Sequence, residues 1–154
     1  MSVLAQDPNL AECGLSYADP SMMALANLLS HPEIGTARIS EPLAPGGPPV
    51  LRSAKDLGRV LALARLAEPT ELEGWHERWE VALRDKFPSS AEGLASGLGR
   101  GLDRLLDDDD AIDEALHAVQ VGLLAGLGVG RTELIAIARE VQELVTKPLA
   151  ERFG

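Results

Sequence analysis

The sequence has little cysteine and few aromatic residues. Cys13 is the only cysteine among 154 residues, which excludes a disulfide within the chain and a zinc site built on cysteine ligands. Aromatic residues make up 3% of the chain, against 45% for all hydrophobic residues. The core must therefore be built from leucine, valine, isoleucine and alanine, a composition typical of helical bundles rather than β-sandwiches.

Basic residues are also scarce. Lysine and arginine number 14, aspartate and glutamate number 24, and the net charge is −10. This balance argues against nonspecific binding to nucleic acid or to an anionic membrane, since both need clustered cations. The sequence has no apolar run of the roughly 18–20 residues that cross a bilayer, and Met1–Leu10 lacks the basic and apolar pattern of a signal peptide. We therefore expect a cytoplasmic protein with no membrane partner.

The spacing of apolar residues predicts an all-α protein. From residue 53 onward, leucine, valine and alanine recur every three or four residues, as they do on one face of a helix. We expect a single helical bundle over residues 51–154. Residues 1–50 should form an irregular N-terminal arm, one helix and a Pro/Gly-rich loop, which brings the total to about six helices. The loop allows a short strand near Ala37–Ile39, with no evident partner strand.

Helix starts are predicted from capping residues. Asp19-Pro20 indicates the start of the first helix, which should end near Ser30 because Pro32 disfavours helical geometry in the residue before it. Capping boxes, in which serine or threonine is followed three residues later by an acidic residue, predict further starts. The remaining predicted caps are Ser53 with Asp56, Thr70 with Glu73, Ser89 with Glu92, the run Asp107–Asp110, and Thr132.

Glycine is frequent inside the predicted helices, where each one costs about 0.5–1 kcal/mol relative to alanine. Several lie four residues apart, which places them on one helix face. These are Gly93, Gly97 and Gly101 in one helix and Gly122 and Gly126 in the next. We expect the helices at 90–106 and 111–127 to touch through these flat faces, within the chain or across a dimer.

Three features could carry chemistry, but each has a simpler interpretation. Asp107–Asp110 lacks the separated ligands and closing glutamate of a calcium loop, and it fits an acidic helix start. Ala125–Thr132 approaches the phosphate-binding pattern GxxxxGK[ST], but Ala125 replaces the first glycine and Arg131 the lysine, so we interpret it as a turn between helices. The histidines stand far apart in sequence, at His31, His76 and His117. No catalytic, cofactor-binding or metal-binding residue is predicted.

Two segments carry partial resemblances. GLSYADPSMMALANLLSH and RSAKDLGRVLALARL, within residues 14–66, resemble the helical tail of bacterial nucleotidyltransferase-like proteins of the abortive-infection and toxin–antitoxin type. The resemblance implies a helical region without transferase chemistry, because the Gly-Ser turn and paired strand aspartates of that family are absent. LGVGRTELIAIARE, at residues 127–140, looks like the turn and second helix of ribbon-helix-helix repressors, but no basic strand precedes it.

These observations predict a non-enzymatic helical protein that acts through protein–protein contact, as a homodimer or as a subunit of a complex. The candidate packing or interface residues are the five glycines named above together with Trp75 and Trp79, which lie one helical turn apart. Two alternatives remain open: an accessory helical domain of a nucleotidyltransferase-like enzyme system, and an acidic antitoxin-like regulator. No cofactor is expected.

Overall fold

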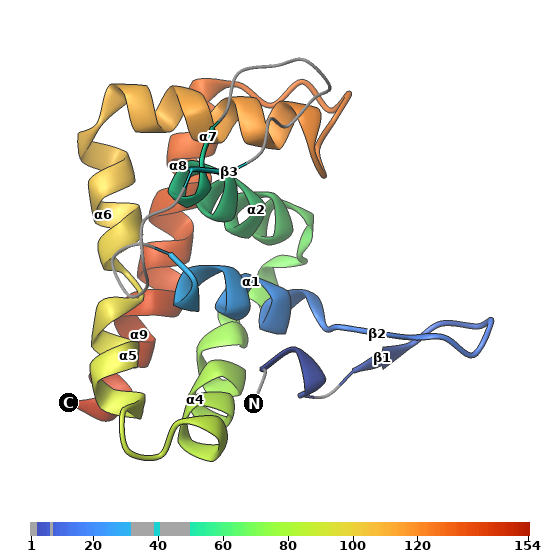
Figure 1. Ribbon diagram of the computed structural model, residues 1–154, viewed down its shortest axis with the longest axis vertical. Coiled ribbons are helices and arrows are strands. Elements are labelled where there is room, and N and C mark those ends of the chain that lie inside the picture. Colours follow the sequence, from blue (N-terminus) through green and yellow to red (C-terminus); the bar gives the residue numbers. More distant parts are fainter. Residues whose placement is uncertain (1–2, 7, 32–38, 41–49) are drawn as a thin grey trace.

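The computed structural model describes residues 3–6, 8–31, 39–40 and 50–154, and it confirms the predicted all-α fold (Figure 1). The helices are α1 (Pro20–Leu29), α2 (Arg52–Leu66), α3 (Pro69–Glu73), α4 (Trp75–Lys86), α5 (Ala91–Gly97), α6 (Arg100–Asp107), α7 (Asp109–Val121), α8 (Arg131–Val141) and α9 (Lys147–Phe153). A 3-10 turn, η1, spans Val3–Ala5, and a π-helical segment, η2, spans Gln142–Thr146.

Helix α2 is the centre of the packing. It contacts α1 on one side and α7 on the other, and these three helices lie across the view in Figure 1, while the remaining long helices run along the long axis. Gly58 of α2 allows the approach to α7. A Cβ atom at this position would lie 3.0 Å from the Ala115 carbonyl oxygen and 3.0 Å from the Ala118 Cβ atom. The close glycine contact between α2 and α7 is therefore made by Gly58, which is not one of the five glycines predicted to lie between helices.

The core follows the apolar periodicity of the sequence. The predicted face of α2, which includes Leu57, Val60 and Leu61, is buried in one continuous hydrophobic cluster. Trp75 and Trp79 are both 0% exposed, and their ring centroids lie 5.8 Å apart. With so few aromatic residues, this pair supplies the largest buried side chains of the bundle.

Two small antiparallel hairpins precede α2. Strand β1 (Asn9–Leu10) pairs with β2 (Ser16–Tyr17), and β3 (Ile39–Ser40) pairs with β4 (Val50–Leu51). The expectation of an unpaired strand in the Pro/Gly-rich loop was therefore wrong, because its partner lies on the far side of the loop, next to α2. The rest of that loop, residues 32–38 and 41–49, lies outside the described residues.

The predicted helix caps are only partly correct. Asp19 caps α1 as expected, and Asp108 caps α7 by accepting hydrogen bonds from the backbone N–H groups of Asp110 and Ala111. Within the described chain, no side chain caps the other predicted starts. Those helices begin after Leu51 (α2), Glu68 (α3), Ser90 (α5) and Gly130 (α8). Asp56, predicted to serve a capping box, instead accepts hydrogen bonds from the Ser30 hydroxyl at 3.2 Å and Arg52 Nε at 3.3 Å.

Two predicted helices are shorter than expected. The helix predicted at 90–106 is divided at Leu98-Gly99 into α5 and α6, and the helix predicted at 111–127 ends at Val121. Gly126, with φ +81°, adopts a conformation that L side chains rarely take, so it stands in a turn rather than a helix. Leu116, Val119, Leu123 and Leu127 have the spacing of one helix face and were expected to be buried together, but the end of this segment departs from that pattern. Leu123 and Leu127 are exposed, whereas Leu124 and Val129 are buried.

The C-terminal helix continues past Pro148. The chain passes from α8 through η2 into α9, where Pro148 occupies the first turn. A proline in a first helical turn removes an N–H group that has no partner within the helix. The π-helical segment lies directly before this turn, and the helix then continues to Phe153.

Candidate interaction surface

The N-terminal hairpin formed by β1 and β2 extends away from the helices (Figure 1). It carries three large apolar side chains at its surface. Leu10, Leu15 and Tyr17 are 72%, 69% and 53% exposed. Leu15 and Tyr17 lie two residues apart, so they share one face of the hairpin. The turn contains Gly14 with φ +82° and is closed by the hydrogen bond from the Gly14 N–H to the Ala11 carbonyl oxygen at 2.8 Å.

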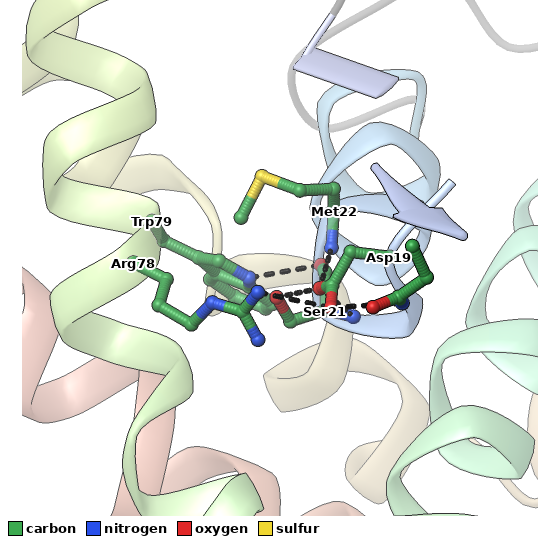
Figure 2. A network of polar contacts seen from close by, with 6 residues as sticks. Asp19, Ser21, Met22, Arg78 and Trp79 are labelled. Carbon is green, nitrogen blue, oxygen red and sulfur yellow. Dashed lines mark hydrogen bonds and ion pairs between the residues drawn. The ribbon is translucent and has the colours of Figure 1, made fainter. Parts of the chain in front are cut away.

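The base of this hairpin is held by the polar network around Asp19, which Figure 2 shows at close range. The Asp19 carboxylate accepts hydrogen bonds from the Ser21 N–H at 2.9 Å and from the Met22 N–H at 3.3 Å. Arg78 of α4 pairs with it at 2.9 Å, and the Asn9 amide of β1 lies at 3.5 Å. Asp19 thus connects the hairpin, the start of α1 and α4.

Asp19 is ionised in this network despite its burial. Asp19 is buried, and only 3% of its surface is exposed to solvent. Burial alone raises the pKa of the Asp19 carboxyl, but the hydrogen bond from Ser21, the charge of Arg78 and the Met22 N–H together outweigh it and lower the pKa below its ordinary value of 3.8. A second contact between the same elements is the Trp79 indole N–H, which donates to the Ser21 carbonyl oxygen at 2.9 Å.

A groove of about 670 Å³ lies between α1, α2 and the end of α7. Its described lining consists of Met23, Asn27, Lys55, Gly58, Arg59, Ala62, Leu63, Ala118, Val121, Gly122 and Leu123. Two of these residues are basic and none is acidic, in a chain whose net charge is −10. At the α7 end, Val121 and Leu123 are 42% and 53% exposed, and Arg59 is exposed beside them. The groove has no signature in the sequence, because the residues of α2 and α7 that form its walls are about 60 positions apart.

The predicted interface residues occupy different environments. Trp75 and Trp79 are fully buried, so they pack the core and contribute nothing to the exposed surface. Gly97 is buried in α5. Gly93 is exposed, and a Cβ atom there would meet no described atom within 4 Å.

Gly122 and Gly126 follow the last residue of α7, and a Cβ atom at either position would not have another helix as its nearest neighbour. A Cβ atom at Gly126 would meet nothing described within 4 Å, and at Gly122 it would approach the Ala118 carbonyl oxygen of its own helical turn at 2.6 Å. The expected contact of two helices within the chain through Gly93, Gly122 and Gly126 was therefore wrong. A contact across a dimer stays a prediction.

Gly101 does provide a close contact, with the buried His31 at the end of α1. A Cβ atom on Gly101 would lie 2.8 Å from His31 Cε1 and 2.9 Å from His31 Nδ1. We expect Gly101→Ala to cost about 1–2 kcal/mol of unfolding free energy because the imidazole must move inside a packed core. Gly93→Ala is the matched control and should stabilise the protein by about 0.5–1 kcal/mol. Urea denaturation measures both, and a stabilising Gly101→Ala would contradict the packing described.

The segments that could carry chemistry are engaged in helix contacts. Arg131, which stands at the lysine position of the phosphate-loop pattern, pairs with Asp109 and, at 2.6 Å, with Asp113. It therefore fastens the start of α8 to α7. Among the described residues, no three histidine, cysteine, aspartate or glutamate side chains lie close enough together to hold a metal ion.

In the part of the chain that the structure describes, no helix is both long and apolar enough to cross a membrane. Comparison with protein families, curated proteins and solved structures finds no match to this chain. The resemblance of residues 14–66 to the tail of nucleotidyltransferase-like proteins stays a prediction.

Proposed function

We propose that this chain acts by binding protein through its N-terminal hairpin rather than by catalysis. The observation that carries the proposal is the exposure of Leu10, Leu15 and Tyr17 together on a single projecting element. Leu15 and Tyr17 share one face of the hairpin, and Leu10 lies on the other. Exposed apolar side chains of this kind are typical of interaction sites, and tyrosine is enriched at protein interfaces. The short strands also present backbone hydrogen-bonding groups at their outer edges, to which a partner strand can add.

The anchoring of the hairpin supports the same function. Asp19 contacts both Asn9 on β1 and Arg78 on α4, so the hairpin leaves the bundle from a buried polar network rather than from a loose tail. An element whose base is already fixed loses less conformational freedom when it binds. We therefore expect the hairpin to engage its partner with little rearrangement of α1 or α4.

Site-specific photocrosslinking in the native cells tests this proposal. A photoreactive amino acid at Leu15 should form covalent adducts with a defined protein, whose mass identifies it. The matched control is Val81, an isolated apolar residue on α4 that is 59% exposed. Adduct formation at Leu15 no greater than at Val81 would overturn the proposed function.

A further inference from the structure

The groove between α1, α2 and α7 is lined by apolar and basic side chains, which indicate what kind of segment can bind in it. Its open end combines the apolar side chains of Val121 and Leu123 with the guanidinium of Arg59. Arg59 makes no ion pair with any residue that the structure describes, whereas Arg52 and Arg65 of the same helix pair with Asp56 and Glu133. An apolar segment that carries a carboxylate would satisfy both parts of this surface. The volume of about 670 Å³ is in the usual range for a binding cleft.

The tip of the chain's own hairpin has the matching chemistry. Glu12 is exposed between Leu10 and Leu15, and it forms no ion pair with another described residue. The tip therefore presents a carboxylate together with exposed leucines, of which Leu15 lies on the same face as Tyr17 and Leu10 on the opposite face, since Leu10 pairs with Ser16. The chain has a net charge of −10, whereas the groove is lined by Lys55 and Arg59 and by no acidic residue, so the groove favours an acidic tip electrostatically.

We infer that the groove of one copy receives the hairpin tip of a second copy, with Glu12 facing the partner copy's groove at Arg59 and Leu15 resting on its apolar wall. The inference rests on the proposed function and names its partner. Hairpin and groove are different surfaces of one chain, so a two-fold dimer contains the contact twice. Each copy then donates a hairpin and accepts one.

Charge reversal tests this reciprocal contact. Arg59→Glu places Glu12 opposite a glutamate, and Glu12→Arg places an arginine opposite Arg59, so either variant alone should raise the dimer dissociation constant by at least about tenfold. An equimolar mixture of the two variants restores opposite charges in both contacts. Sedimentation equilibrium should therefore show dimers for the wild type and for the mixture, and weakened dimers for each variant alone.

Further measurements distinguish a loss of the dimer contact from a loss of folding, and a failure of this inference from a failure of the proposed function. Both side chains are exposed, so the variants should keep the wild-type circular dichroism spectrum, which shows that a loss of dimer does not come from unfolding. Cys13 adjoins Glu12 and is exposed, so a single fluorophore there reports whether the tip is covered. A monomeric wild type, a dimer indifferent to both reversals, or a mixture that stays monomeric would each overturn the inference. Crosslinks from Leu15 to a different protein would overturn it while supporting the proposed function, and crosslinks no more frequent than at Val81 would overturn both.

Discussion

Replacing Asp19 with alanine should lower the unfolding free energy by about 2–4 kcal/mol. The substitution removes the cap of α1, and it leaves the Arg78 guanidinium and the Ser21 hydroxyl without their acceptor. Arg78 is partly exposed, so water compensates for part of the lost ion pair. Urea denaturation followed by circular dichroism measures the loss. Faster amide hydrogen exchange in β1 and β2 should accompany it, because Asn9 loses its contact with Asp19.

Asp19→Asn is the matched control because asparagine caps helices as well as aspartate but carries no charge. The folded-state pKa of Asp19 lies below its ordinary value of 3.8, so the folded protein favours the ionised form more than the unfolded chain does. This contribution to stability is present above the unfolded pKa and is lost as the pH falls through the folded-state pKa. The stability difference between wild type and Asp19→Asn should therefore shrink below about pH 4. A difference that stays constant from pH 7 to about pH 2.5 would show that the charge of Asp19 does not stabilise the fold.

A leucine at Gly58 should separate α2 from α7 and cost about 3 kcal/mol or more. Even a Cβ atom would lie 3.0 Å from the Ala115 carbonyl oxygen, and the backbone of α7 cannot move aside as a flexible side chain can. Because α2 is the central helix, the strain should reach the groove that α2 and α7 form together. Thermal melting measures the loss of stability, and sedimentation measures whether the distorted groove still supports the dimer.

Gly93→Leu provides the comparison for this prediction. Gly93 is exposed on α5, with no described atom within 4 Å of a Cβ atom, so leucine there should leave stability unchanged or slightly raised. If Gly58→Leu were as stable as Gly93→Leu, the close contact between α2 and α7 would not be required for the fold.

The amino-acid sequence alone predicted the features that depend on neighbouring residues. Asp19 caps α1 through N–H groups two and three residues further on, and the buried face of α2 follows from leucine and valine spaced three and four apart. The burial of Trp75 and Trp79 follows from the same periodicity. The all-α class was likewise readable from a composition rich in aliphatic and poor in aromatic residues.

Pattern alone was misleading where a local motif competed with distant contacts. Ser53 and Asp56 have the spacing of a capping box, yet Asp56 turns inward to Ser30, 26 residues away. Glycines four apart suggested a helix face, but Gly126 occupies a turn and the close contact between α2 and α7 occurs at Gly58. A single-sequence pattern cannot distinguish these cases, because each depends on which helix lies opposite.

What only the tertiary structure decided is the candidate interaction surface. The hairpin has its direction because Asp19 meets Arg78, 59 residues further along the chain, and the groove exists because α7 returns to lie against α2. No chemical role for Glu12 or Arg59 follows from the sequence, and it is the surroundings in the fold that set these two residues apart from the other charged residues. The sequence by itself determined which faces of the regular helices are buried, as in α2, since burial there follows local periodicity. Which exposed faces can bind was decided by folding, since a binding surface is assembled from residues that only the fold brings together.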